Sequence, residues 1–284
     1  MELSIIIPVF NEEDSINEII DRIKSVMRDT DDTYEILVVN DGSTDNSKAI
    51  LEAIQGIKLI NHVNNLGYGA SLKTAIMKAK YDFVLITDAD GTYPIEDIPK
   101  LTQYLDRFDM AVGARIKTRN VSFSKRIAKW IITKTANMLS KNKIPDINSG
   151  FRVFKKEAAL KFFNLYPDGF SFTTTITLVF LMNNYRVKYI PIEYHKRKGK
   201  SKMKPKEFFG FLNLLLNIMM YFNPLRIFSM LSFFLFLVGI AIFLYSLLFL
   251  NKVLDITVTI ILLSSLQVFI LGLIADLIIR RGSK

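Results

Sequence analysis

The sequence contains no cysteine among its 284 residues. Disulfide frameworks, thiolate metal sites and cysteine nucleophiles are therefore excluded. The length is sufficient for one large domain or two modest ones, with a sizeable core. A mean hydropathy of +0.25 beside 23% charged residues is unusual for one soluble domain. The apolar residues are therefore expected to be unevenly distributed along the chain.

Charged residues are missing from two long segments near the C-terminus. Ile227–Asn251 and Ile256–Ala275 contain none, and each has the roughly 20 residues needed to cross the hydrocarbon core of a bilayer. Lys252 and Asp255 lie in the gap, which is too short for a folded domain. Two buried core helices are the alternative, but apolar side chains on every face exceed what a soluble core normally encloses. The sequence predicts a transmembrane hairpin.

A signal-peptide pattern is not found at the N-terminus, where Leu3–Phe10 is a short apolar run beside an acidic residue and suits a buried strand. Two spans place both chain ends on one side of the membrane. The basic residues on that side include Arg226 before the first span, and Arg280, Arg281 and Lys284 after the second. The positive-inside rule then predicts a multi-pass protein of the cell membrane, with its large N-terminal region and both termini in the cytoplasm.

Acidic residues are scarce in the second part of the chain. Residues 1–114 carry 10 Lys and Arg against 20 Asp and Glu, a net charge of −10, whereas residues 115–284 carry 27 against 7, a net charge of +20. Arg115–Lys143 has nine basic residues and no acid, and Arg186–Lys206 has nine with only Glu193 opposing. Such runs are usually solvated faces, and nucleic-acid binding is conceivable. Beside a membrane hairpin they favour anionic headgroups or a lipid phosphate instead, so we expect no nucleic-acid partner.

The first 115 residues alternate apolar runs with helical patterns. The expected strands are Leu3–Val9, Tyr34–Asn40, Ile57–Asn61, Asp82–Thr87 and Met110–Gly113. The expected helices are Glu13–Arg28, Thr44–Gln55, Ala70–Ala79 and Ile95–Leu105. This alternation predicts an α/β domain with a parallel sheet covered on both faces, in which ligands bind beyond the carboxyl ends of the strands.

Polar clusters follow three of these strands. Asp88-Ala-Asp90 follows the fourth strand, where two carboxylates could hold Mg²⁺ or Mn²⁺ against phosphate oxygens; a capping or turn pair is the alternative. Asn40-Asp-Gly-Ser43 follows the second strand, where a carboxylate could accept hydrogen bonds from a nucleobase or ribose. A tight turn with a helix cap at Ser43 or Thr44 is equally compatible. Asn65–Gly69 precedes a helix and offers backbone N–H groups to phosphate.

Two further segments have the composition of helices that lie at a membrane surface. Ser122–Ser140 mixes aromatic and aliphatic residues with Lys and Arg, although an ordinary helix packed on the sheet is the alternative. Phe208–Phe222 is apolar and aromatic and leads into the first span.

The sequence therefore predicts a catalytic domain at 1–204 that includes the amphipathic segment 122–140. An interfacial helix at 205–224 and a hairpin at 225–284 follow. The expected spans of that hairpin are about 227–250 and 256–279.

The motifs as a set resemble the family 2 glycosyltransferases. Those that match in order and spacing are Ile5-Ile-Ile-Pro-Val-Phe-Asn-Glu-Glu13, Val38-Val-Asn-Asp-Gly-Ser-Thr-Asp45 and Asp88-Ala-Asp-Gly91. Asp146-Ile-Asn-Ser-Gly-Phe-Arg152 and Gly199-Lys-Ser-Lys202 narrow the resemblance to the polyprenyl-phosphate branch, typified by dolichyl-phosphate mannose synthase. The resemblance covers residues 1–204 by motif and the hairpin by architecture. It implies a GT-A fold, which is Rossmann-like with a mostly parallel sheet.

The resemblance also implies roles for residues on the donor side of the site. Pro8, Glu12 and Asp41 would hold the nucleoside of a nucleotide sugar, and Asp88 would contribute to the same site. Asp88 and Asp90 would hold the diphosphate together with Mg²⁺ or Mn²⁺. One departure concerns the metal: the family usually has a Gln ligand two residues after the second Asp.

Thr92 occupies the place of that Gln, so we expect Thr92 to complete the metal ligands. The acceptor side would bind the lipid phosphate through Arg115, Lys129, Thr133, Lys196, Arg197 and Lys202. Arg115 lies in Gly-Ala-Arg, which matches the Gly-Ser-Arg of the family. Lys196 occupies the usual place of an Arg, with Arg197 one step later, so both are included.

The chemistry implied by the resemblance needs no general base. A polyprenyl phosphate is already ionised near neutral pH, so catalysis reduces to positioning and to neutralising phosphate charge. Asp88, Asp90 and Arg115 are the expected catalytic residues of an inverting transfer of a hexose or N-acetylhexosamine for glycan assembly. GDP-mannose, UDP-glucose and UDP-N-acetylglucosamine remain open as donors. A homo-oligomer formed through the transmembrane helices also remains open.

Three other functions are compatible with parts of the sequence. A processive polysaccharide synthase should have Gln-x-x-Arg-Trp, but the only tryptophan, Trp130, lies in Ala-Lys-Trp. A membrane-anchored enzyme acting on a sugar hydroxyl would need a carboxylate base, and Asp146 could serve. A non-enzymatic membrane adaptor is disfavoured because Asp88 and Asp90 are both intact.

Overall fold

The chain divides into two compact units, residues 1–211 and 212–284. The computed structural model describes residues 1–115, 144–169, 171–195, 220–221, 224–249 and 255–282. The predicted amphipathic segment 122–140 lies outside these residues, as does the predicted domain boundary at 204.

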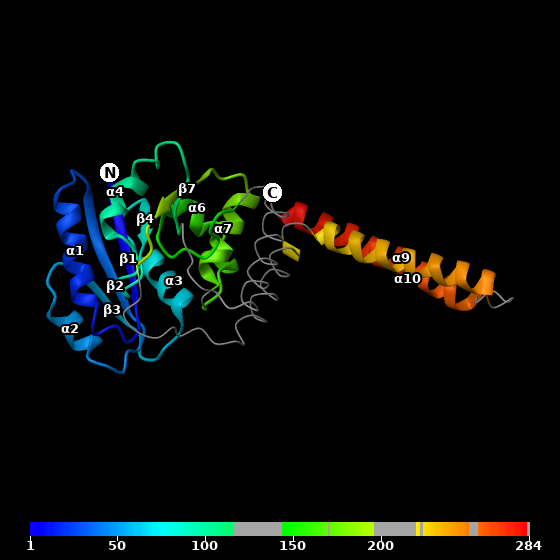
Figure 1. Cartoon of the computed structure of the whole chain (residues 1–284), viewed down its shortest axis with the longest axis horizontal. Helices are drawn as coiled ribbons and strands as arrows, with labels where there is room; N and C mark the ends of the chain where they lie inside the picture. The colour runs from blue at the N-terminus through cyan, green and yellow to red at the C-terminus, as the bar shows by residue number, and fades with distance from the viewer. Residues whose placement is uncertain (116–143, 170, 196–219, 222–223, 250–254, 283–284) are drawn as a thin grey trace. The chain divides into compact units, whose positions relative to one another are not determined.

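The first unit contains a seven-stranded sheet (Figure 1). Its strands are β1 (Glu2–Val9), β2 (Thr33–Asn40), β3 (Lys58–Asn61), β4 (Phe83–Ile86), β5 (Met110–Arg115), β6 (Arg152–Lys155) and β7 (Val187–Ile192). Their order is β3-β2-β1-β4-β6-β5-β7. Every pairing is parallel except the two made by β6. The strand order reverses between β1 and β4, and ligands of open α/β sheets bind at such a point.

Helices cover both faces of the sheet (Figure 1). They are α1 (Ile16–Arg28), α2 (Ser47–Ala53), α3 (Tyr68–Lys78), α4 (Ile98–Thr102), α6 (Lys156–Leu160) and α7 (Phe172–Met182), with 3₁₀ turns η1 (Ile95–Asp97) and η2 (Phe163–Leu165). Helix α1 buries Ile16, Ile19, Ile20 and Ile23 against alternate residues of β1. This i, i+3, i+4, i+7 spacing forms one apolar stripe, and each buried side chain contributes about 1.5–3 kcal/mol.

The predicted mostly parallel α/β sheet is confirmed, and each of the five predicted strands is present with ends within two residues of those expected. Three helix predictions were too long. The helix expected at 13–28 begins at Ile16. The helix expected at 44–55 is limited to α2, and that expected at 95–105 is divided into η1 and α4, with Pro99 in the first turn of α4. Strands β6 and β7 and helix α7 were not predicted.

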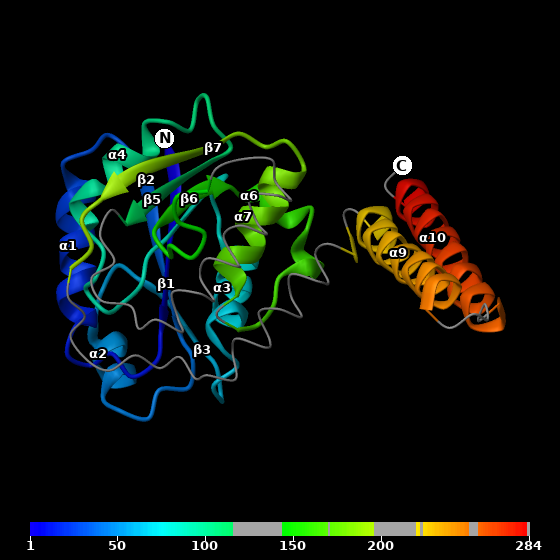
Figure 2. The same ribbon diagram turned by 45° about the vertical axis from the view of Figure 1, so that its right-hand side comes forward.

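The second unit contains α9 (Pro224–Phe249) and α10 (Asp255–Gly282), which lie side by side (Figure 2). Both helices are long and apolar enough to cross a membrane. The two helical segments expected at about 227–250 and 256–279 are confirmed as helices.

Small residues recur every seven positions where the two helices meet. Ser232, Gly239 and Ser246 are buried on α9. A Cβ on Gly239 would lie 3.0 Å from a Leu262 methyl carbon. A seven-residue spacing keeps one helix face in contact with its neighbour, and small residues let the backbones approach closely.

Candidate active site

The loops after β1 and β2 are fastened to each other. The Asn11 side chain accepts a hydrogen bond from the Thr44 backbone N–H (2.8 Å), and the Ser43 hydroxyl accepts one from Asn11 N–H (3.1 Å). The Glu12 N–H donates to the Ser47 hydroxyl at 2.9 Å. A helix cap at Ser43 or Thr44 was therefore a wrong prediction, because α2 begins at Ser47 and the two side chains hold the neighbouring loop instead.

Asp41 is buried and organises the loop after β3. Its Oδ1 accepts hydrogen bonds from His62 Nδ1 (2.7 Å) and Leu66 N–H (2.9 Å), and its Oδ2 accepts one from Gly67 N–H (2.9 Å). An ionised carboxylate has about four acceptor positions, so a further donor can bind. Asp41 can therefore support this loop and still contact a ligand. The predicted nucleoside contacts of Pro8, which lies in β1, and of Asp41 remain predictions.

His62 was not identified from the sequence. Its Nδ1 lies 2.7 Å from Asp41 Oδ1 and its Nε2 lies 3.0 Å from the Thr74 hydroxyl, so the ring links Asp41 to α3. Asn40 of β2 is paired with Asn61 of β3, which puts the next residues of both strands side by side. His62 could therefore have been found only from the register of the parallel pair β2 and β3, which local sequence patterns do not reveal.

Glycines allow the loop over residues 64–69 to pass close to other backbone. Gly42 has φ +66, and a Cβ there would lie 2.7 Å from the Asn64 carbonyl carbon. Gly67 and Gly69 both lie against the backbone of residues 167–169. No larger residue fits these three positions without movement of the backbone.

Asp90 receives two hydrogen bonds from Thr92. The Thr92 hydroxyl and N–H donate to Asp90 Oδ1 at 2.6 Å and 3.1 Å. Both residues are buried, and Ser15 of the β1–α1 loop donates to the Ala89 carbonyl at 2.7 Å. Thr92, predicted as a metal ligand, thus orients Asp90 in this structure; its direct ligation of a metal remains a prediction.

Asp88 lies against two partners from distant parts of the chain. The Tyr68 hydroxyl donates to Asp88 Oδ1 at 3.0 Å. Burial raises the pKa of Tyr68 well above its ordinary value, with the nearby Asp88 charge adding to the shift, so the phenol stays protonated and remains a donor. Gly150 lies beside this pair and leaves space for the carboxylate.

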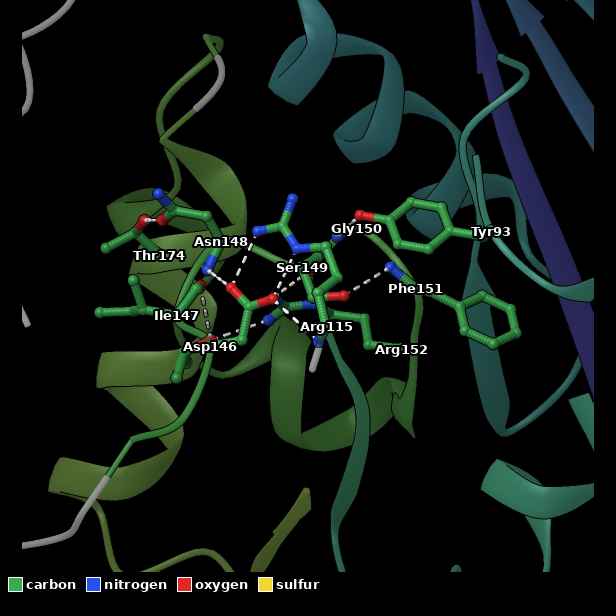
Figure 3. A network of polar contacts seen from close by, with 11 residues as sticks. Tyr93, Arg115, Asp146, Ile147, Asn148, Ser149, Gly150, Phe151, Arg152 and Thr174 are labelled. Atoms are coloured by element: carbon green, nitrogen blue, oxygen red, sulfur yellow. Dashed lines mark hydrogen bonds and ion pairs between the residues drawn. The ribbon is translucent and has the colours of Figure 1, made fainter. Parts of the chain in front are cut away.

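Arg115 and Asp146 form a bidentate ion pair (Figure 3). Arg115 Nε lies 2.6 Å from Asp146 Oδ2 and Nη2 lies 2.8 Å from Oδ1, while the Arg115 backbone N–H also donates to Oδ2. The Tyr194 ring lies 5.2 Å from the guanidinium carbon, a cation–π contact. Burial favours a higher pKa for Asp146, but the hydrogen bonds and charge of Arg115 outweigh it and lower the pKa.

The loop from Asp146 to Gly150 contacts both charged groups of the site. Asp146 binds Arg115 at one end of the loop, and Gly150 lies against Asp88 at the other. The Gly150 N–H also donates to the Tyr93 hydroxyl at 2.7 Å (Figure 3). A single five-residue loop therefore links the residue expected to bind the acceptor with the residue expected to bind the donor.

Arg152 is fully buried and hydrogen-bonds to the loop from Asp146 to Gly150. Its guanidinium donates to the Ser149 carbonyl, to the Thr173 carbonyl at 3.0 Å and to the Thr177 hydroxyl at 2.9 Å. Burial lowers the pKa of Arg152. Arg152 ends the motif that begins at Asp146, but no role was predicted for it; in the structure it attaches the loop to α7.

The carboxylates of Asp88 and Asp90 fit a hard divalent cation by their chemistry. The described part of the chain holds no group of three or more His, Cys, Asp or Glu that could bind a metal alone. Mg²⁺ and Mn²⁺ are usually bound by one or two carboxylates together with substrate phosphates. The donor set therefore suits a cation that arrives with, or is completed by, a diphosphate.

Five residues predicted to bind the lipid phosphate lie outside the described residues: Lys129, Thr133, Lys196, Arg197 and Lys202. Arg115 is the one member of that set that the structure describes.

Comparison with known proteins gives matches over both units. The glycosyl transferase family 2 profile matches residues 4–163, and the GtrB C-terminal hairpin profile matches residues 223–280. The low-salt glycan biosynthesis hexosyltransferase Agl6 of Haloferax volcanii is 28% identical over 209 residues, which is 71% of this chain and 50% of that protein. The dolichol-phosphate mannosyltransferase of Pyrococcus furiosus is 29% identical over 235 residues, 77% of this chain and 64% of that protein.

A third relative is the undecaprenyl-phosphate 4-deoxy-4-formamido-L-arabinose transferase of Aeromonas hydrophila, 28% identical over 54% of this chain and 49% of that protein. The chain thus spans from about half to just under two thirds of the length of these three relatives. Among solved structures, glucosyl-3-phosphoglycerate synthase from Mycobacterium tuberculosis, in complex with Mn²⁺, UDP and phosphoglyceric acid, matches with a TM-score of 0.60 and 16% identity, over 76% of this chain and 78% of that one. At that identity the match establishes the fold, and the predicted GT-A fold is confirmed.

Proposed function

Because this chain belongs to glycosyl transferase family 2, we propose that it transfers a hexose or N-acetylhexosamine from a nucleotide sugar to a polyprenyl phosphate. The reaction is an inverting one carried out at the membrane, and its product is a lipid-phosphate-linked sugar for glycan assembly. The names of two relatives, a dolichol-phosphate mannosyltransferase and an undecaprenyl-phosphate sugar transferase, support the acceptor class. GDP-mannose, UDP-glucose and UDP-N-acetylglucosamine are the candidate donors.

The observation that carries this proposal is the loop from Asp146 to Gly150. It contacts Arg115, a strong binder of phosphate, and also Asp88, a carboxylate suited to a cation–diphosphate unit. An acceptor phosphate at Arg115 and a donor diphosphate at Asp88 would therefore be neighbours. The reaction requires just this proximity, since the phosphate oxygen attacks the anomeric carbon.

The described residues have separate parts in this mechanism. Asp41, with Pro8 and Glu12 nearby, would bind the nucleoside. Arg115 uses Nε and Nη2 on Asp146, and its remaining N–H groups can donate to the acceptor phosphate. Attack forms the bond from phosphate oxygen to anomeric carbon and breaks the bond to the nucleoside diphosphate, with inversion.

Asp88 and Asp90 would hold Mg²⁺ or Mn²⁺. When bound, such a cation would neutralise charge on the leaving diphosphate. A solved structure of the same fold was obtained with Mn²⁺ and UDP, which supports a divalent cation in this chain.

The hydroxyl-acceptor alternative has less support. It needs a general base, and Asp146 was the candidate. Both Asp146 oxygens accept hydrogen bonds from Arg115, and the pKa of Asp146 is lowered, so it is a weak proton acceptor. An acceptor that is already ionised removes this requirement.

The hairpin is proposed to anchor the catalytic unit to the cytoplasmic face of the cell membrane, with both termini in the cytoplasm. Because the chain has no cysteine, single cysteines can report its topology. An impermeant thiol reagent added outside sealed cells should label position 253 and leave positions 2 and 283 unlabelled. Labelling at all three positions would contradict this orientation.

The proposed function is tested by following a radiolabelled sugar. The full chain in detergent micelles is incubated with each candidate nucleotide sugar, polyprenyl phosphate and Mn²⁺, and label is measured in the organic phase. Transfer should require the polyprenyl phosphate and should stop in EDTA. Label that moves to a water-soluble sugar acceptor instead would favour the hydroxyl-acceptor enzyme.

A further inference from the structure

Asp88 has a hydrogen bond that the mechanism above does not use. The Tyr68 hydroxyl donates to Asp88 Oδ1 at 3.0 Å. A Cβ placed on Gly150 would lie 2.9 Å and 3.0 Å from the two Asp88 oxygens and 3.0 Å from the Tyr68 hydroxyl. The phenol and the carboxylate are therefore packed directly against the backbone at Gly150, where a side chain has no space.

The backbone of Tyr68 is itself fixed from two directions. Gly67, before it, donates its N–H to Asp41 Oδ2 at 2.9 Å. Ala70, after it, donates its N–H to the Asp168 carbonyl at 3.0 Å. Tyr68 begins α3 between these two attachments, so the position of its ring is set by Asp41 and by the Asp168 carbonyl.

We propose that Tyr68 is a positioning residue, which orients the Asp88 carboxylate for a divalent cation and the diphosphate of the donor. The hydrogen bond restricts rotation of the carboxylate, so its oxygens are presented in one orientation before the ligand arrives. Residues that hydrogen-bond metal-binding carboxylates typically contribute about 10–100-fold to metal affinity or activity. This inference rests on the proposed function, because it assumes that Asp88 binds the cation.

The test measures Mn²⁺ binding to the full chain by electron paramagnetic resonance, with saturating UDP and, separately, with GDP. Tyr68→Phe keeps the ring and removes the hydroxyl, and should weaken Mn²⁺ binding about 10–100-fold. The matched control is Tyr166→Phe, because the buried Tyr166 hydroxyl has no hydrogen-bond partner within the described residues. That control should bind Mn²⁺ as the wild type does.

A second pair of variants perturbs the same contact from the opposite side. Gly150→Ala places a methyl group against Asp88 and Tyr68 and should also weaken Mn²⁺ binding. Gly169→Ala is its control, since nothing lies within 4 Å of a Cβ at Gly169. If Tyr68→Phe does not fold, Gly150→Ala provides the test.

A positioning role also predicts how the kinetics change. In Tyr68→Phe the Mn²⁺ concentration for half-maximal transfer should rise, and turnover at saturating Mn²⁺ should recover most of its wild-type value. Lower turnover at every Mn²⁺ concentration, with Mn²⁺ affinity unchanged, would overturn the inference.

Asp88→Asn separates failure of the inference from failure of the proposed function. Loss of Mn²⁺ binding in Asp88→Asn together with normal binding in Tyr68→Phe and Gly150→Ala would refute the role of Tyr68 and leave the proposed function standing. Absence of Mn²⁺ binding by the wild type with either nucleotide would contradict the proposed function and the inference with it.

Discussion

Buried polar side chains have different roles in the two units of this protein. At the carboxyl edge of the sheet they fix loops that carry charge: Thr92 donates to Asp90, and Asp146 holds Arg115. In the hairpin they join two helices, as Ser232 and Ser265 do when each donates its hydroxyl to the backbone carbonyl of the other. The buried polar contacts of the first unit therefore hold charged loops, whereas those of the second link two packed helices.

This difference implies that single substitutions at the sheet edge should have large effects and single substitutions in the hairpin small ones. Asp90→Ala is expected to have the largest effect. It removes a buried carboxylate that Thr92 orients, and loss of one such electrostatic element costs about 10²–10³-fold in turnover. The measurement is label transfer to polyprenyl phosphate, with circular dichroism to show that the variant folds. Wild-type activity of Asp90→Ala in the presence of EDTA would show that transfer does not depend on a metal ion at this site.

Arg115→Ala should be next in size. Losing a charge-assisted hydrogen bond to the acceptor phosphate costs about 1.5–3 kcal/mol, or about 10–150-fold in acceptor efficiency. Arg115→Lys should keep only part of the wild-type acceptor efficiency, because Lys lacks the planar guanidinium group with its several fixed N–H donors. Titration of polyprenyl phosphate at saturating donor gives the acceptor effect, and nucleotide-sugar binding should remain unchanged.

Arg115→Ala also leaves Asp146 buried without its counter-charge, so the comparison should be repeated in an Asp146→Asn background. A variant that loses donor binding and keeps its acceptor dependence would move Arg115 to the diphosphate side of the site.

The Arg115–Asp146 pair should also give the stability a defined pH dependence. The pKa of Asp146 is lowered in the folded state. The ionised carboxylate therefore stabilises the folded chain fully above the unfolded pKa of about 3.9, and this stabilisation is lost as the pH falls through the folded-state pKa. At neutral pH, Asp146→Asn should cost about 1.5–3 kcal/mol. The difference in unfolding temperature between wild type and Asp146→Asn should shrink as the pH is lowered below about 4. A difference that grows on acidification would contradict this assignment.

The smallest effect is expected in the hairpin. Ser232→Ala removes hydrogen bonds to Ser265 across the helix pair, and such bonds average about 0.6 kcal/mol in membranes. Ser229→Ala is the matched control, because among the described residues the Ser229 hydroxyl donates to the Arg226 carbonyl of its own helix and not across the helix pair. Unfolding in mixed micelles should separate the two variants by this amount. A cost of several kcal/mol for Ser232→Ala would mean that the hairpin also depends on single contacts.

Local patterns were sufficient for the elements that differ most from their surroundings. The hairpin followed from the absence of charge, and β1, β2 and β4 followed from apolar runs that end in polar turns. Strand β6 was not predicted because it is a strand by virtue of long-range antiparallel pairing with β4 and β5, which a local pattern does not show. Helix α7 was not predicted because its sequence is rich in β-branched residues, which favour strands. Burial of the helix outweighs this local preference.

The same limit applies to the site. Asp88, Asp90 and Arg115 could be predicted as site residues from motifs, since a motif shows which residue types recur at which spacing. Their partners could not, because contacts such as Tyr68 with Asp88 depend on how separate loops are packed together. Asp146 illustrates the consequence: from the sequence it was a candidate base, and in the folded chain it is the ion-pair partner of Arg115.

The central claim is that the acceptor is an ionised lipid phosphate, held by Arg115 and needing no base. It is tested most directly by comparing polyprenyl phosphate with the polyprenol of the same chain length, at equal concentration and saturating donor, in the label-transfer assay. The account predicts transfer to the phosphate and none above background to the alcohol. Comparable transfer to the polyprenol would contradict it and would require a base that activates a hydroxyl group.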